Sequence, residues 1–451
     1  MSFFKLQAGS RFTNKQIIAF LLPVIFEQLM VAGLGMADTF MVSSLGEVAV
    51  AGVALVSRID NFAKQFFLAL AQGGSVVLSL YIGANNQGNA QKALKDNIRI
   101  VVAIGLMTML VMVAFKDNIL NLLFADAEKD VLKVSSIYFT VTAFSYPLIA
   151  LYYAASATFR AMGEATLPFV ASIAMMIINL VLKYIFIFHM DMGVMGAALS
   201  TLIAMGIIGA WLTFMLKSPK NKVSLHGLFK LDLSLIISKK ILTISVPNGI
   251  EQGMFQLGAL AIAGLVSGLG TASIAADSLA RTISPLIHSI GAAFNAVMIM
   301  IVGQCIGAGR PDEAVFYTKH LFKFDYLMTT VASVLVIIFL KPIISVFSVS
   351  AQAQNLTFWI MVIYSIGSFL LYPTSFALAS TLRGAGDTKF VMVVSTASMF
   401  IFRIGAAYLF VHAFNMGIIG TWVAMVSDWA IRSAIFIIRF KIGKWKEHKV
   451  I

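Results

Sequence analysis

The chain has 451 residues, of which 59% are hydrophobic and only 12% are charged, and its mean hydropathy is +0.91. Soluble proteins carry roughly a quarter charged residues, so this composition excludes a soluble domain and predicts a protein that crosses a membrane many times. The net charge of +13 does not indicate a nucleic-acid partner, because the basic residues gather in the segments on one side of the predicted spans.

Twelve stretches are long and apolar enough to cross a bilayer as helices, which takes about 20 residues each. In chain order they are 16–43, 53–83, 98–115, 132–158, 167–189, 194–216, 241–266, 275–306, 324–345, 357–379, 390–413 and 417–439. We therefore predict an all-α membrane protein with twelve transmembrane helices. The excess of Lys and Arg on one side follows the positive-inside pattern and places both termini in the cytoplasm, where the basic tail would meet anionic membrane lipids.

The chain contains an internal repeat. The stretch 23–46 returns at 247–270 at one constant offset, with Pro, Glu-Gln and Leu-Gly at equivalent places. The most polar interior segment, 217–240, separates two sets of six spans. We predict an N-terminal lobe at 1–216, a cytoplasmic linker at 217–240 and a C-terminal lobe at 241–451, as two pseudo-symmetric six-helix lobes around a central cleft, where transporters commonly bind substrate.

Asp38 is the first candidate for function. It lies inside the first span, where a carboxylate is costly, and the equivalent position in the second repeat is Ile262. Asn179 and Lys183 lie four residues apart in the fifth span and therefore share one helix face. We predict that Lys183 pairs with Asp38 and that the pair acts as a proton switch. The alternatives are that Asp38 only bonds neighbouring helices and that Lys183 extends to the membrane interface.

Glu27 and Glu251 occupy equivalent places, each four residues after a proline. Their symmetry favours a structural or gating role over direct handling of an ion. Amide side chains near them are candidates for substrate binding or for polar contacts between helices: Gln28, Asn248, Gln252 and Gln256.

The second and eighth spans carry charged groups in the halves that we place outside. They are Arg58, Asp60, Lys64, Asp277, Arg281 and His288. We expect these side chains to line an outward-facing cavity, with His288 deepest and Asp277 nearer the mouth; the alternative is that they are the hydrated ends of long helices. Arg403, equivalent to Asn179, is expected to lie against a buried acid or to face the cleft, and the sequence does not identify its partner.

These residues resemble those of the multidrug and toxic compound extrusion (MATE) family, in its bacterial form. The resemblance covers the whole chain and rests on three motifs. They are Pro23, Glu27-Gln28-Leu29, Gly35, Asp38-Thr39, Met41-Val42 and Leu45-Gly46 in the first span; Gln304 and Gly307-Ala308-Gly309 after the eighth; and Arg383-Gly384-Ala385-Gly386-Asp387-Thr388 after the tenth.

The resemblance implies a secondary active transporter that exports amphiphilic, often cationic organic compounds in exchange for H⁺ or Na⁺, with Asp38 as a cation site. Many relatives have an Asn-x-x-x-Asp pair in the fifth span, where this chain has Asn179 and Lys183. A Na⁺ site needs several oxygen ligands, so Lys183 favours H⁺. No phosphate-binding loop, metal-ligand cluster or catalytic set occurs, so we expect no enzyme activity and no cofactor besides the coupling ion.

The main alternative is a flippase of lipid-linked precursors from the same superfamily, for which Arg58, Arg281 and Arg403 would supply phosphate contacts. A receptor or passive channel is a further alternative, and the repeat-breaking Asp38 argues against it. We expect a monomer in the inner (plasma) membrane of a prokaryotic cell, with small organic substrates and membrane lipids as partners.

Overall fold

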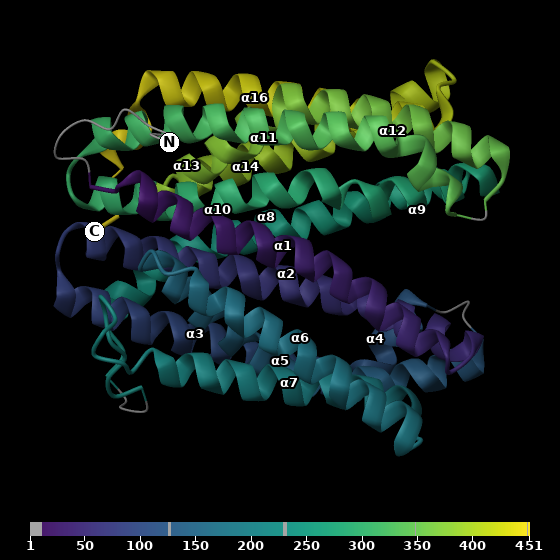
Figure 1. Cartoon of the computed structure of the whole chain (residues 1–451), viewed down its shortest axis with the longest axis horizontal. Coiled ribbons are helices and arrows are strands. Elements are labelled where there is room, and N and C mark those ends of the chain that lie inside the picture. Colours follow the sequence, from purple (N-terminus) through teal and green to yellow (C-terminus); the bar gives the residue numbers. More distant parts are fainter. Residues whose placement is uncertain (1–10, 125–127, 229–231, 348, 449) are drawn as a thin grey trace. The chain divides into compact units, whose positions relative to one another are not determined.

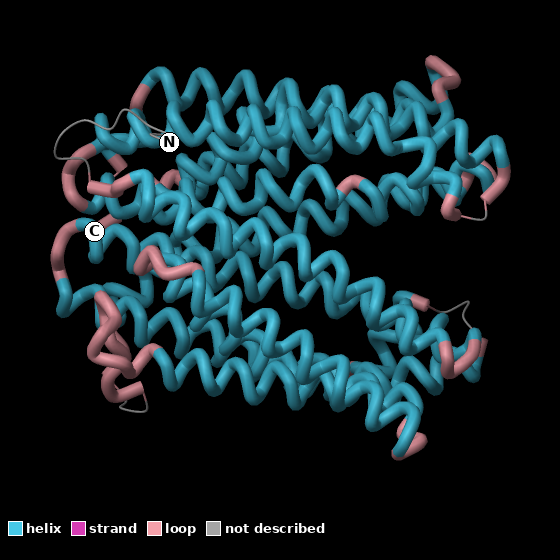
Figure 2. Tube along the Cα trace, in the orientation of Figure 1, coloured by secondary structure: helices cyan, strands magenta, loops and turns pink. Residues whose placement is uncertain are grey.

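The structure is a computed structural model. It describes residues 11–124, 128–228, 232–347, 349–448 and 450–451, except for the side chains of residues 29 and 31–40. The described residues form helices joined by short loops, with no strand among them, as Figures 1 and 2 show. This confirms the predicted all-α fold class.

The helices follow one another in this order: α1 (Asn14–Ser43), α2 (Glu47–Gly83), α3 (Gln87–Ala114), α4 (Lys116–Leu123), α5 (Lys129–Ala161), α6 (Thr166–Tyr184), α7 (Gly193–Met215), α8 (Leu235–Ser267), α9 (Thr271–Ile283), α10 (Pro285–Gly307), α11 (Pro311–Ser345), α12 (Ala351–Tyr372), α13 (Leu378–Gly384), α14 (Thr388–Ser398), α15 (Ala406–Tyr408) and α16 (Gly417–Ile442). Four π-helical segments continue some of them: η1 (Ile185–His189), η2 (Pro373–Ala377), η3 (Met399–Gly405) and η4 (Leu409–Ala413). A short 3₁₀ helix, η5 (Lys444–Glu447), follows α16.

Among the described residues, 11 helical runs are long and apolar enough to cross a membrane. The remaining predicted span, 16–43, coincides with α1. The single span predicted at 275–306 is wrong in one respect: α9 ends at Ile283 and α10 begins at Pro285. A proline has no backbone N–H and clashes with the preceding turn, so it opens a new helix more readily than it continues one.

The chain divides into two compact units, Leu22–Gly249 with Ile451, and Met1–Leu21 with Ile250–Val450. We call them the first and the second unit. Both divisions fall inside long helices, α1 and α8, so the N-terminal part of each helix is assigned to the other unit. The predicted lobes placed the division in the linker instead, and their boundaries and the central cleft stay a prediction.

Helix α5 is the centre of the first unit, where it packs against α2, α3 and α7. Small residues permit these close contacts, as is common between helices in membranes. A Cβ atom on Gly105 of α3 would lie 3.1 Å from the Cα atom of Pro147, and one on Gly52 of α2 would lie 3.2 Å from the backbone nitrogen of Ser135. Glycine is therefore the residue that lets α2 and α3 approach α5.

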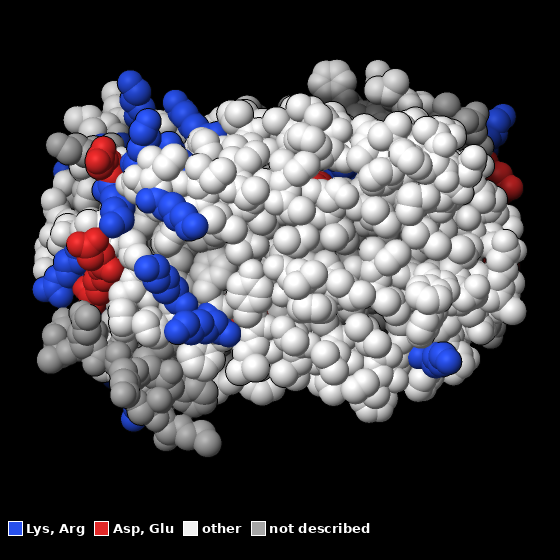
Figure 3. All heavy atoms as spheres, turned by 90° about the horizontal axis from the view of Figure 1, so that it is seen from above, with Lys and Arg blue, Asp and Glu red and all other residues white. Residues whose placement is uncertain are grey.

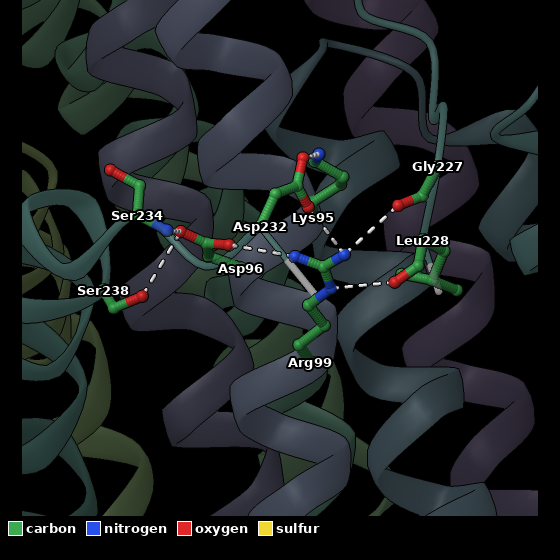
Figure 4. A network of polar contacts seen from close by, with 8 residues as sticks. All are labelled: Lys95, Asp96, Arg99, Gly227, Leu228, Asp232, Ser234 and Ser238. Carbon is green, nitrogen blue, oxygen red and sulfur yellow. Dashed lines mark hydrogen bonds and ion pairs between the residues drawn. The ribbon is translucent and has the colours of Figure 1, made fainter. Parts of the chain in front are cut away.

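The predicted linker is anchored to α3 by ion pairs (Figure 4). Lys95 Nζ lies 2.5 Å from Asp232 Oδ2, and Arg99 lies 3.0 Å from Asp232 Oδ1. Arg99 also donates to the carbonyl oxygens of Gly227 and Leu228. These contacts hold both described parts of the linker against the N-terminal half of α3.

The second unit has an apolar core that includes Tyr364, Trp422 and Trp429. Helix α16 supplies both tryptophans and packs against α12. Charged side chains are unevenly distributed on the surface seen in Figure 3. Lys and Arg gather near one end, and the long middle band is almost free of charged side chains. Such a band is the surface expected to face lipid tails.

Candidate functional site: a charged pocket in the first unit

The first unit contains a pocket of about 500 Å³ between α2, α5, α6 and α7. Its walls combine apolar side chains with a few polar and charged ones, as in small-molecule sites generally. The polar and charged lining residues are Ser57, Arg58, Asp60, Asn61, Lys64, Tyr138, Thr142, Ser145, Asn179, Lys183 and Thr201.

Helix α2 presents Asp60 and Lys64 to the pocket from one face, because residues four apart lie one above the other. The Asp60 side chain is buried and accepts a 2.9 Å hydrogen bond from the hydroxyl of Tyr146 on α5. The positive charge of Lys64 acts on the same carboxylate. Asp60 is therefore held by one hydrogen bond and one neighbouring cation inside the pocket.

Asn179 and Lys183 form the opposite wall, on α6. They share one helix face, as predicted, and only 5% and 3% of their surface is exposed. The Asn179 amide donates a 3.0 Å hydrogen bond to Thr201 on α7. Helix α6 continues as the π-helix η1 immediately after Tyr184, and such segments occur frequently at functional sites.

The pocket changes the expected set of coupling residues. The side chain of Asp38 lies outside the described residues, so its pairing with Lys183 stays a prediction. Asp60 was expected to line an outward-facing cavity or to lie at a hydrated helix end, and it was not counted among the coupling residues. Its position 13 residues into a 37-residue helix is the signal that would have placed it at membrane depth.

Glu27 and Glu251 each have an arginine partner. Arg160 lies 2.6 Å from Glu27 in the first unit, and Arg383 lies 2.7 Å from Glu251 in the second. Both carboxylates are buried, and in each the second oxygen, Oε2, has no hydrogen-bond partner among the residues that the structure describes. The two arginines occupy equivalent places in the repeats. The sequence showed the matched glutamates without showing that they bind the matched arginines.

The other amide candidates lie near these pairs along α1 and α8. Asn248 is buried, and its Oδ1 atom has no hydrogen-bond partner. Gln28, Gln252 and Gln256 are half-buried. Their predicted contact with substrate stays a prediction.

Asp277 and His288 lie in the packed interior of the second unit. Asp277 accepts hydrogen bonds from Arg281 at 2.7 Å and from the indole of Trp422 at 3.0 Å. His288 contacts the hydroxyl of Tyr364, and its ring lies 4.6 Å from that of Tyr372. Structural partners therefore surround both residues, and the outward-facing cavity predicted around them stays a prediction.

Arg403 lies near a buried acid, as one of the two expectations proposed. Its neighbour is Asp428 of α16, whose negative charge acts on the guanidinium group. Asp428 also accepts a hydrogen bond from Ser398 and lies 3.8 Å from Arg432. The sequence could not identify this partner because Asp428 lies in a different span, 25 residues further along the chain.

A comparison with protein families gives one match, to the family described as MatE, over residues 23–185 and 247–409. Together these segments cover most of the chain. The protein belongs to the MATE family. The two matched segments begin at Pro23 and Pro247, the residues with which the sequence repeat begins.

Among curated MATE relatives, a probable multidrug resistance protein NorM from Thermotoga maritima is 23% identical, covering 97% of this chain and 94% of its own. The uncharacterized transporter YisQ from Bacillus subtilis is 25% identical, covering 94% and 93%. The human multidrug and toxin extrusion protein 1 is 21% identical, covering 92% and 72%. Members of this family are transporters, so the protein is a transporter of the MATE family and not an enzyme.

Solved MATE structures confirm the fold. An outward-facing multidrug resistance MATE transporter of the MOP superfamily is 19% identical, with a TM-score of 0.89 over 96% of this chain and 97% of its own. A MOP superfamily transporter from Pyrococcus furiosus, whose binding pocket is described as having reversed polarity, is 19% identical, with a TM-score of 0.88 over 96% of both chains. At these identities the likeness concerns the fold alone.

Proposed function

We propose that this MATE protein is a secondary active antiporter that exports amphiphilic, often cationic organic compounds in exchange for H⁺, and that the pocket in the first unit is its coupling site. The proposal rests on the position of Asp60, whose buried carboxylate shares the pocket with Lys64 and Lys183. A carboxylate beside side-chain cations can instead bind a proton or a cationic substrate.

The composition of the pocket supports H⁺ over Na⁺. A hard cation such as Na⁺ requires several oxygen ligands around it. Asp60, Thr142, Asn179 and Thr201 supply oxygens, but Lys64 and Lys183 place positive charge in the same pocket. A proton needs only one acceptor, so Asp60 alone, or together with Asp38, is sufficient.

The test is efflux of a fluorescent cationic dye by the purified protein in proteoliposomes, under an imposed pH gradient and separately under a Na⁺ gradient. We expect efflux to follow the pH gradient, and Asp60→Asn to abolish it. The matched control is Asp117→Asn, because Asp117 is an acid of the short helix α4, which is not among the candidate spans. Dye movement that is unchanged by Asp60→Asn would contradict the proposal.

A flippase of lipid-linked precursors is the second candidate. It is supported by the basic side chains of the pocket, Arg58, Lys64 and Lys183, which are suited to a phosphate group. A fluorescent lipid with a diphosphate headgroup, added to the same proteoliposomes, separates the two functions. Flipping of this lipid without dye efflux would favour the flippase.

The remaining parts of the proposal concern the setting of the transporter. We place it as a monomer in the inner membrane, with both termini in the cytoplasm and with small organic substrates and membrane lipids as its partners. Cysteine labelling from each side of the membrane tests the orientation. The labelled variants carry Cys305→Ser and a single new cysteine at position 218 or 117. Residue 218 should be labelled from the cytoplasmic side only.

A further inference from the structure

The second unit contains a buried acid that the proposed function does not use. Asp325 lies on α11, the most apolar of the candidate spans, and it is 0% exposed. It lies near the middle of this 35-residue helix, in the packed interior of the unit. A carboxylate at this depth is costly unless it is paired, protonated or used.

Within the part of the chain that the structure describes, Asp325 differs from the other buried acids by having no cation partner. Among the described residues, arginines pair with Glu27, Asp96, Glu251, Asp277, Asp387 and Asp428, and Lys64 acts on Asp60. The Asp325 carboxylate accepts a 3.1 Å hydrogen bond at Oδ1 from the hydroxyl of Thr329, one turn further along α11. Its Oδ2 atom has no hydrogen-bond partner.

The elements packed against α11 bring polar groups toward this carboxyl. Helix α10 carries Asn295, whose Oδ1 is also buried without a hydrogen-bond partner. Helix α12 ends at Tyr372, and the charge of Asp325 and the side chain of Asn295 both act on its hydroxyl. The π-helix η2 follows directly and contacts both α10 and α11. Short π-helical segments occur frequently at functional sites.

The charged and titratable neighbours leave Asp325 without a neutralising partner. Helix α10 carries two titratable groups: His288, which contacts Tyr364 and Tyr372 of α12, and Cys305, which lies near Glu313 and Arg310. Arg432 of α16 acts on Tyr372, but its guanidinium group lies 4.7 Å from the ring of Phe376 and 3.8 Å from Asp428. On α11 itself, Lys323 is exposed and Tyr326 donates to the carbonyl of Leu370.

We propose that Asp325 is a second proton-binding site of the transporter, located in the second unit and independent of the pocket in the first. In the charged form Thr329 donates to the carboxylate, and in the neutral form Oδ2 carries the proton. The equivalent position in the first repeat is Val101, so this site is present once per chain. The inference does not depend on which compound is exported.

The test is infrared difference spectroscopy of the purified full-length protein in lipid, between acidic and alkaline buffer and in H₂O and D₂O. We expect a carboxylic C=O band that shifts in D₂O, that disappears in Asp325→Asn and that persists at a shifted frequency in Thr329→Val. A pH indicator should count one released proton fewer per molecule in Asp325→Asn. Asp60→Asn should remove a different band, and this control identifies Asp325 as a separate site.

Difference spectra of Asp325→Asn identical to those of the wild type would overturn the proposal. A carboxyl group that keeps one protonation state over the whole pH range gives this result, because its band cancels in the difference. If Asp325→Asn does not fold, Asp325→Glu is used in its place. A carboxylic C=O band at the same frequency in Asp325→Glu and in the wild type would then also overturn the proposal. No substrate is added, so a negative dye efflux experiment leaves this test unaffected.

Discussion

Arg160 and Glu27 form a buried ion pair of 2.6 Å although they are 133 positions apart in the chain. Arg383 and Glu251 repeat this arrangement in the second unit at 2.7 Å. Removing one partner of a buried pair leaves the other charge unpaired, which typically costs about 3–5 kcal/mol.

We therefore expect Arg160→Gln and Glu27→Gln each to lower the free energy of unfolding by about 3 kcal/mol, with a double variant close to either single one. Thermal unfolding in detergent measures this, and the Arg383 and Glu251 variants provide an internal replicate. If the two single effects simply add in the double variant, the pair contributes no coupling energy.

Tyr146 provides a graded test of the pocket because its hydroxyl donates to Asp60 at 2.9 Å. Tyr146→Phe removes the hydrogen bond and leaves the carboxylate in place, so we expect reduced efflux that still requires a pH gradient. Loss of a hydrogen bond to a charged group typically costs about 1.5–3 kcal/mol. Efflux should be measured over a range of pH beside Tyr184→Phe, which alters an exposed tyrosine; equal profiles for the two variants would contradict a role for this contact.

Lys183 tests the coupling from the other wall of the pocket. We expect Lys183→Ala to change both the rate of efflux and its pH dependence, because a buried cation is removed from the vicinity of the carboxylates. Lys133→Ala, at an exposed position of α5, is the matched control. If Lys183→Ala behaves like this control, the proton switch does not include Lys183.

Substitution by alanine should have opposite effects at two glycines. Gly105 lies at the contact of α3 with α5, whereas Gly264 lies on α8 with open space around it. Gly105→Ala places a Cβ atom 2.9 Å from that of Ala150 and 3.1 Å from the Cα of Pro147, so it should destabilise the protein by about 1–3 kcal/mol. At Gly264 no atom lies within 4 Å of the added Cβ. Gly264→Ala should stabilise its helix by about 0.5–1 kcal/mol. Equal unfolding temperatures for the two variants would show that α3 and α5 adjust without cost.

The linker should respond to acid. Hydrogen bonds from Lys95 and then Arg99 lower the pKa of Asp232 from 3.8 to about 2. A depressed folded-state pKa contributes stability above the unfolded value and loses it as the pH falls toward the folded value. We therefore expect the linker to detach between about pH 4 and pH 2.

Cleavage by pepsin over this range measures the detachment. Asp232→Asn should be cut at pH 4 as fast as the wild type is cut at pH 2, after correction with an unstructured peptide. A variant that resists cleavage like the wild type at pH 4 would show that Asp232 does not hold the linker.

The sequence predicted the apolar spans and the repeat because both depend on patterns along the chain. It also predicted that Asn179 and Lys183 share a face, since four residues make about one helical turn. It missed the Arg160 and Arg383 partners, the link from Asp428 to Arg403 and the burial of Asp60, because these depend on which helices are neighbours. Asp325 was not among the predicted site residues. The predicted span began at 324, whereas α11 begins at Pro311, so the sequence did not show that Asp325 lies near the middle of a helix.

The matched Glu–Arg pairs have a consequence for the ancestry and engineering of this chain. The residue equivalent to Asp60 in the second repeat is Ser284, and the residue equivalent to Asp325 in the first repeat is Val101. After the duplication, the two copies therefore kept the same Glu–Arg ion pair and diverged in their other buried acids. A synthetic protein made of two copies of the first repeat would retain two Glu–Arg ion pairs and two copies of Asp60. It would contain no counterpart of Asp325.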